Sequence, residues 1–274
     1  HLQISYYCFL IALIITIGYI ITWIRKKEWK HMLVAGGITA AAAIVGVAAS
    51  AITLMTTSEY SKFTMRGGKD VEIRQDTVTS AKTSGLDTAY AWVYSLGVAE
   101  TSTLLMPNAF GGGSSNSIGE GSSKAITNLK NKGVDENAAR QLIGPLPKYW
   151  GALPYTAGPA YLGVIIFLLG IIGFVVVRTP LRWAMLAATL LGIFMAWGKY
   201  FVSFNLFLFE HLPYYNKFRA PSMAQTIPQL TITIIAVLAL QRLLFEGTNK
   251  EVMKAEFKKV LYTLGGVFAV LGIM

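Results

Sequence analysis

Six stretches of this chain are apolar and free of charged residues over lengths close to the thickness of a membrane. They cover residues 4–24, 32–55, 157–177, 183–198, 222–241 and 260–274. An α-helix rises about 1.5 Å per residue, so about 20 residues cross a hydrocarbon core of roughly 30 Å. Four stretches reach that length, and the 16-residue stretch 183–198 spans if Arg182 and Lys199 extend toward the two membrane surfaces. The sequence therefore predicts an all-α polytopic membrane protein with about six transmembrane helices.

The composition agrees with this class and excludes several kinds of site. Hydrophobic residues make up 54% of the chain and charged residues only 14%, against about a quarter in soluble domains. Cys8 is the single cysteine, and His1, His31 and His211 are far apart in sequence, so neither a disulfide framework nor a Cys/His metal cluster is expected. No cofactor is evident and no metal ligands are predicted, although the sequence leaves the use of a divalent metal open.

Lysine and arginine are distributed unevenly among the short loops. Loops 25–31, 178–182 and 242–259 hold eleven of these residues, whereas the opposite short loop 199–221 holds three. The positive-inside rule therefore assigns the eleven to the cytoplasm. The long stretch 56–156 carries 10 basic and 9 acidic residues, and a loop of this length crosses largely regardless of charge, so we expect it outside. The net charge of +10 is then mainly a topology signal, and no nucleic-acid partner is predicted.

These assignments divide the chain into three regions. Residues 1–55 contain transmembrane helices 1 and 2, residues 56–156 form an extracytoplasmic loop subdomain, and residues 157–274 contain helices 3 to 6 with an outer interfacial segment at 198–221. A connection of 101 residues is too long to lack structure of its own, so the middle region is expected to fold as a small subdomain of mixed secondary structure.

Local patterns within the long loop predict its elements. Alternation predicts a short strand at 70–74, and short helices are predicted at 123–130 and 135–142, the second with Asp135 as its N-cap. The glycine-rich segment 111–121 is interpreted as flexible. It is not a phosphate loop, because no Gly-Lys-Ser/Thr sequence follows it.

Three polar segments on the outer side concentrate groups that can do chemistry. They are residues 56–68, 87–113 and 198–221, and together they are predicted to build a pocket at the membrane surface. Lys217 and Arg219 go against the positive-inside bias, which favours phosphate binding, with contact to lipid headgroups as the simpler alternative. Four aromatic residues are candidates for sugar stacking or for an ordinary interfacial belt: Tyr60, Trp92, Trp150 and Tyr215.

Two carboxylates of the long loop are weak candidates for catalysis. Glu59 and Glu100 have no second carboxylate at a spacing typical of paired acid and base groups. Their type alone therefore does not predict a role.

Several separate blocks of the chain carry a family resemblance. They are HLQISYY, TTSEYSKFTMRGG, KTSGLDTAYAWVYSLGVAETSTLLMPNAFGGGS, YWGALPYTAGPAYLG and WGKYFVSFNLFLFEHLPYYNKFRAPSMA. Together these blocks, which extend over nearly the whole chain, resemble the YfhO-type bacterial membrane proteins in their Bacteroidetes version. Members of that family look like GT-C glycosyltransferases, which take a sugar from a polyprenyl-phosphate carrier on the outer face of the cytoplasmic membrane.

The resemblance implies a function and assigns donor binding and catalysis to different parts of the full protein. It implies transfer of a sugar to a cell-envelope acceptor, in the cytoplasmic (inner) membrane, with Lys217 and Arg219 as first-choice ligands of the donor phosphate and Arg66 and Lys62 as second choices. The chain begins at His1 and stops inside an apolar stretch, so we expect an internal piece of a longer protein. GT-C enzymes generally carry their catalytic Asp or Glu in the first outer loop, so the resemblance places it upstream of His1.

Two other function classes remain open on the sequence. One is a transporter or flippase for a lipid-linked or polar substrate, and the other is a noncatalytic membrane scaffold. Ion-coupled transporters usually carry ionisable residues inside their spans, and the six apolar stretches contain none. That absence disfavours transport.

Overall fold

The computed structural model describes residues 1–61, 63–64, 66, 85–119, 124–158, 160–245 and 250–273. Every regular element within these ranges is helical, which confirms the predicted helical class. The sequence predicts a loop subdomain of mixed secondary structure, but its described residues form only helices and one isolated bridge. The α-helices are α1 (Leu2–Lys26), α2 (Trp29–Ala49), α3 (Ala51–Ser61), α4 (Thr88–Ala91), α5 (Lys124–Asn131), α6 (Glu136–Ile143), α7 (Val164–Val176), α8 (Leu181–Ala196), α9 (Val202–His211), α10 (Thr226–Phe245) and α11 (Lys250–Ile273). Shorter 3₁₀ helices are η2 (Ala99–Leu104), η3 (Gly198–Phe201), η4 (Tyr215–Lys217) and η5 (Pro221–Gln225).

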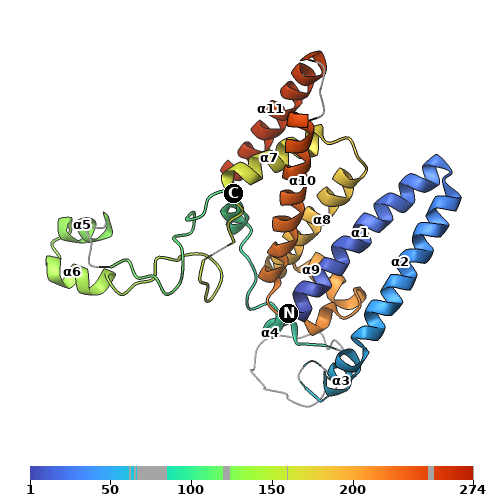
Figure 1. Ribbon diagram of the computed structural model, residues 1–274. Helices are drawn as coiled ribbons and strands as arrows, with labels where there is room; N and C mark the ends of the chain where they lie inside the picture. The colour runs from blue at the N-terminus through green and yellow to red at the C-terminus, as the bar shows by residue number, and fades with distance from the viewer. Residues whose placement is uncertain are drawn as a thin grey trace.

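The helices form a bundle around α8 and α10 (Figure 1). Helix α10 packs against α7 and α8, α1 packs against α8, and α11 packs against α7. Within the described ranges, four helical segments are long and apolar enough to cross a membrane, namely Leu2–Lys26, Trp29–Ala49, Leu181–His211 and Pro221–Phe245. This composition indicates a helical membrane protein.

The third and sixth predicted spans differ from the structure. Helix α7 has only 13 residues, Val164–Val176, whereas the apolar stretch began at residue 157. The backbone before it is not helical: the N–H of Leu162 donates to the carbonyl of Leu104 at 3.1 Å, and Gly163 has a φ of 102°. Helix α11 has 24 residues, but the Lys and Glu residues of its first half leave too short an apolar length to cross a membrane.

Small residues allow the central helices to approach closely. A Cβ atom added to Gly173 of α7 would lie 2.6 Å from the carbonyl oxygen of Ile235 in α10, and one added to Gly192 of α8 would lie 2.7 Å from Cβ of Ile227. Between α8 and α10 the hydroxyls of Thr189 and Thr231 lie 2.8 Å apart. Small residues and interhelical hydroxyl bonds are typical of helix packing in membranes, where lipid chains supply no hydrophobic drive for helix association.

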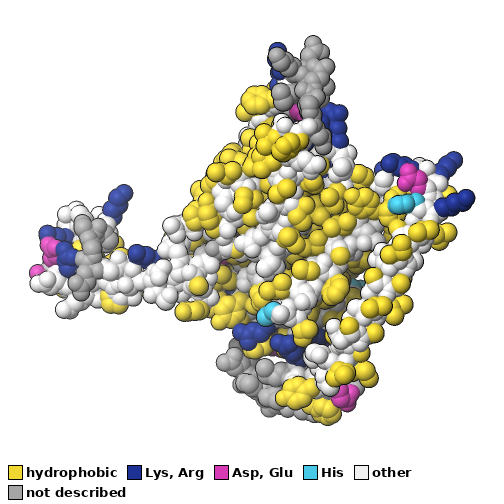
Figure 2. All heavy atoms as spheres, viewed as in Figure 1, with side chains coloured by type: hydrophobic (Ala, Val, Ile, Leu, Met, Phe, Trp, Pro, Cys, Tyr) yellow, Lys and Arg dark blue, Asp and Glu magenta, His cyan; other side chains and the backbone are white. Residues whose placement is uncertain are grey.

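Helix α2 stands apart from this core. It runs antiparallel to α1 (Figure 1), and no residue of α2 is buried. Hydrophobic side chains cover the outside of the bundle and both helices of this hairpin, while Lys and Arg gather near their ends (Figure 2). Helices α1, α7 and α10 end on the side of the bundle opposite the N-terminus (Figure 1). Of the eleven basic residues, Lys27 directly follows α1 and Arg178 lies between α7 and α8, and the other nine belong to the helices that adjoin these connections.

The chain bends sharply at Gly198, between α8 and the helices η3 and α9 that follow it. Gly198 has a φ of 45°, and a Cβ there would meet the Ser95 hydroxyl oxygen. Asn205 in α9 donates to the carbonyls of Phe194 and Phe201 at 2.9 and 3.1 Å. Eleven residues of straight helix would separate Asn205 from Phe194 by roughly 16 Å. The side chain of Asn205 therefore caps the carbonyls that the bend exposes.

The loop region contains an arm that projects from the bundle, with α5 and α6 at its tip (Figure 1). These helices match the predicted ones, and the Asp135 carboxylate accepts from the N–H groups of Asn137 and Ala138 at 3.0 and 3.3 Å. The stem of the arm consists of residues 106–119 and 144–156, which run antiparallel and exchange backbone hydrogen bonds. The glycine-rich segment is therefore paired with the returning chain as far as residue 119. The predicted strand 70–74 lies outside the described residues.

Candidate functional site

Two of the three polar segments predicted to meet do lie side by side. Backbone N–H groups of Leu86, Ala220 and Ser222 donate to the carbonyls of Asn216, Ala91 and Tyr94 at 2.9, 3.0 and 3.0 Å. The 85–94 segment is thereby held along residues 216–222, at the end of the bundle where α1 begins. The third segment joins them through Lys217, whose Nζ donates to the carbonyl of Arg66 at 2.6 Å.

Arg219 lies exposed on two tyrosine rings of the paired segment. Its guanidinium carbon is 5.1 Å from the centre of the Tyr90 ring and 5.7 Å from that of Tyr94, and one N–H donates to the Tyr90 hydroxyl at 2.6 Å. Its backbone carbonyl accepts a 2.8 Å hydrogen bond from the buried side chain of Gln3 in α1. Among the described residues the remaining guanidinium N–H groups have no acceptor, so a positioned fork of donors faces outward.

Lys217 is less exposed than Arg219 and is engaged with protein. Partial burial lowers the pKa of its ammonium group from the usual value. Its hydrogen bond to Arg66 brings the backbone of that residue into the cluster, whereas the Arg66 side chain is exposed. Lys62 lies outside the described residues.

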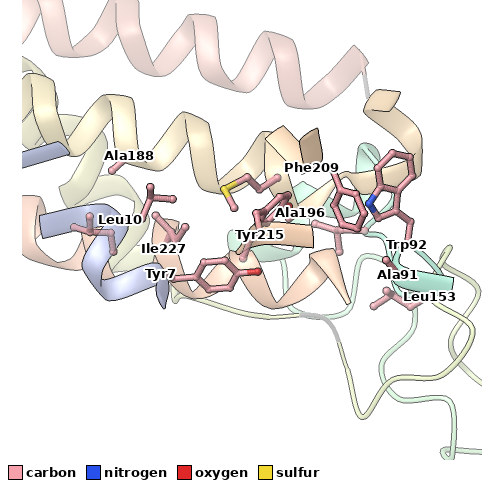
Figure 3. Packing of buried hydrophobic residues seen from close by; sticks show 14 of the residues in the cluster. Tyr7, Leu10, Ala91, Trp92, Leu153, Ala188, Ala196, Phe209, Tyr215 and Ile227 are labelled. Atoms are coloured by element: carbon pink, nitrogen blue, oxygen red, sulfur yellow. The ribbon is translucent and has the colours of Figure 1, made fainter. Parts of the chain in front are cut away.

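Beneath Arg219 lies a small cavity of about 10 Å³, which is room for about one water molecule. Two of its walls are candidate stacking residues, Trp92 and Tyr215, but both belong to the core (Figure 3). The Trp92 ring meets Phe209 edge-on at 5.9 Å between centres, and Phe209 meets Tyr215 at 6.0 Å. These two rings therefore support the segment that carries Arg219.

The other two candidate aromatics are not brought to this cluster. Tyr60 is exposed near the end of α3, and Trp150 is exposed on the stem of the arm, against Phe110 at 4.5 Å between ring centres. The structure therefore assembles only Trp92 and Tyr215 of the four.

Next to the cluster, and sharing Trp92 with the small cavity, is a larger groove of about 480 Å³. It is lined by Thr88, Ala89, Trp92, Val93, Ala152, Pro154, Lys199 and Val202. Sequence reasoning treated Lys199 only as a charge at the end of a span. The groove escaped prediction because its walls come from three parts of the chain far apart in sequence.

Glu100 is enclosed at the root of the arm, where its side chain is 1% exposed. One carboxylate oxygen accepts from the N–H of Gly97 at 2.7 Å and the other accepts from the Tyr149 hydroxyl. The Tyr149 oxygen in turn accepts from the N–H of Leu153 at 2.8 Å. Burial, followed by the bond to Glu100, raises the pKa of Tyr149 above its usual value. This carboxylate fixes the fold and is closed to a substrate.

The second candidate carboxylate, Glu59, is exposed on α3. Within the described ranges no three His, Cys, Asp or Glu side chains are grouped so that they could hold a metal ion.

Comparisons with protein-family models, with curated proteins and with solved structures find no match to this chain.

Proposed function

We propose that the chain is part of a membrane glycosyltransferase that transfers a sugar from a polyprenyl-phosphate carrier to a cell-envelope acceptor. The reaction takes place on the outer face of the cytoplasmic membrane, and the large loop lies on that side. The observation that carries the proposal is the position of Arg219, exposed on Tyr90 and Tyr94 with donors directed outward. The resemblance to the YfhO-type family supplies the reaction class.

The chemistry of the leaving group explains why such a position is useful. When the glycosidic bond breaks, the carrier phosphate gains negative charge, and fixed donors aimed at it stabilise the transition state. The planar guanidinium of Arg219 matches two phosphate oxygens, and the tyrosine rings and the bond from Gln3 to its carbonyl restrict its movement. Lys217 adds a second positive charge two residues away.

The proposal also includes the arrangement of the whole domain. Six spans of a GT-C-like fold would comprise the four long apolar segments together with α7 and α11. The end of the bundle with eleven basic residues would then face the cytoplasm, and the Arg219 cluster would lie at the outer surface.

The test is sugar transfer in membranes that contain the full-length protein to which this chain belongs, with a radiolabelled polyprenyl-phosphate sugar and an isolated cell-envelope fraction. A charge-assisted hydrogen bond is worth about 1.5 to 3 kcal/mol, so we expect Arg219→Ala to lower kcat/KM by roughly tenfold to a hundredfold. Arg219→Lys keeps the positive charge but cannot donate two parallel hydrogen bonds, so its kcat/KM should lie between those of Arg219→Ala and the unchanged protein.

The matched control is Lys27→Ala, which removes an exposed basic residue from the opposite end of the bundle. It should leave transfer unchanged. Transfer within twofold of the unchanged protein for both Arg219→Ala and Lys217→Ala would remove these residues from a donor site. Movement of the intact polyprenyl-phosphate sugar across a vesicle membrane, without sugar transfer, would contradict the glycosyltransferase proposal and favour a flippase.

A further inference from the structure

The groove beside α4 has the shape and lining of a ligand site. Its volume of about 480 Å³ falls within the range of roughly 300 to 1,000 Å³ found for small-molecule pockets. Most of its wall is apolar, and Val93 and Val202 are 40% and 49% exposed there. Exposed valines in a concave wall at the end of membrane-type helices are suited to an alkyl chain.

The three walls of the groove are fixed to one another by hydrogen bonds. Ser95 donates to the carbonyl of Trp92 at 2.7 Å and accepts from the backbone N–H of Lys199 at 3.0 Å. The wall formed by Ala152 and Pro154 is held in place by Leu153, whose N–H donates to the Tyr149 hydroxyl oxygen. The Tyr149 hydroxyl in turn donates to Glu100. The groove is therefore formed before any ligand enters, which reduces the entropic cost of binding.

Lys199 gives the groove a single charged group. It lines the wall beside Val202, is exposed, and lies with its Nζ 5.3 Å from the centre of the Tyr200 ring. No described residue offers its ammonium group a hydrogen-bond acceptor. Thr88 lines another wall of the same groove. The groove thus combines an apolar channel with one positive charge.

We propose that this groove binds one anionic membrane phospholipid, with an acyl chain along Val93 and Val202 and the phosphate on Lys199. Charge complementarity selects an anion at Lys199, and the apolar lining selects an amphiphile rather than a free ion. The site differs from the Arg219 cluster: the two share Trp92, but Arg219 is not among the residues that line the groove, and Lys199 is not among those that line the cavity beneath Arg219. The proposal stands without the proposed sugar transfer.

The experiment is native mass spectrometry of the full chain in detergent micelles, titrated in parallel with phosphatidylglycerol and phosphatidylcholine. We expect one phosphatidylglycerol to be retained more tightly than phosphatidylcholine. Lys199→Gln should weaken its retention by roughly tenfold, the value of one charge-assisted hydrogen bond. Lys199→Arg should restore it. Val93→Trp should abolish retention by filling the groove from an exposed position.

Two further variants make the result specific. Lys148→Gln removes an exposed lysine of the arm and should leave retention unchanged. Arg219→Gln should also leave it unchanged if the retained lipid lies in the groove. Equal retention of the two lipids, or unchanged retention in Lys199→Gln, would overturn the proposal. Loss in Arg219→Gln alone would place the lipid on the Arg219 cluster, which would support the proposed function and refute the groove site.

Discussion

Glu100 is an acidic side chain whose hydrogen-bonding capacity is used by the protein itself. Its carboxylate receives the Gly97 N–H and the Tyr149 hydroxyl, and a Cβ at Gly151 would collide with it. An unpaired buried carboxylate is costly, so these donors explain how the group is tolerated with an exposure of 1%. Its contribution is to join the 97–104 segment to the root of the arm.

Tyr149→Phe tests this contribution. It removes the donor to Glu100 and the acceptor for the Leu153 N–H, so we expect a loss of about 1 to 3 kcal/mol in unfolding free energy. Thermal unfolding in detergent micelles measures the loss. Tyr155→Phe, at a 60% exposed tyrosine of the same region, is the matched control and should change stability little.

The variants Tyr149→Phe and Tyr155→Phe should also differ in how their stability depends on pH above about 10. The pKa of Tyr149 is raised in the folded protein by burial first and by its bond to Glu100 second, relative to the usual 10.0. Its neutral form is thus favoured by folding, and this stability is complete below about pH 10 and lost as the pH rises above it. Unfolding temperatures across that range should fall less steeply in Tyr149→Phe than in Tyr155→Phe. Parallel curves would contradict the role given to Tyr149.

At the residue scale, sequence reasoning identified the charges but not their surroundings. Arg219 and Lys217 could be predicted as a pair because they are two residues apart at the end of a span. The rings beneath Arg219 belong to Tyr90 and Tyr94, more than 120 residues earlier in the chain, and only tertiary pairing brings them there. The groove beside Lys199 could not be predicted, because one of its walls comes from Ala152 and Pro154 at the root of the arm.

At the scale of elements, α11 is attached to the bundle by an ion pair and by a small apolar contact. Among its described side chains only Val260 is buried among the hydrophobic residues. Glu256 accepts from Arg242 of α10 at 2.9 Å and from Arg178, after α7, at 2.7 Å. The Arg242 and Glu256 side chains are 10% and 13% exposed, whereas Arg178 is 63% exposed. The pair with Arg242 should therefore dominate the attachment.

Glu256→Gln should release α11. Removing one partner of a buried pair costs about 3 to 5 kcal/mol, whereas an exposed pair is worth about 0 to 1 kcal/mol. Spin labels at Leu244 and Phe257, both exposed, in a Cys8→Ala background report the distance between α10 and α11 by pulsed EPR. The distance distribution should broaden in Glu256→Gln and much less in Arg178→Gln. Similar broadening in both variants would show that the buried pair is not the main contact.

Elements set by local signals were predicted well, and those set by distant partners were not. Helix α6 follows from Asp135, whose carboxylate caps the N–H groups within its own first turn. Helix α7 starts late because Leu162 and Ala160 bond to Leu104 and Thr103, about 57 residues away. Apolarity alone cannot distinguish a helix from extended chain whose polar groups are satisfied by such a neighbour.

For the whole molecule, the arrangement of basic residues predicts which end faces which compartment. In a Cys8→Ala background, a cysteine at Ser115 should react with a membrane-impermeant thiol reagent in intact spheroplasts, because the loop region is expected outside. A cysteine at Glu28, in the basic connection between α1 and α2, should react only after lysis. Both positions are exposed, so access depends on the side of the membrane. The reverse pattern would invert the orientation.

The arm and the groove share one stretch of backbone. Figure 1 shows α5 and α6 far from the bundle at the end of the stem. The returning segment of that stem is held at Tyr149 and then continues into the groove wall at Ala152 and Pro154. We therefore expect a change at the root of the arm, such as Tyr149→Phe, to reach the groove through this shared backbone.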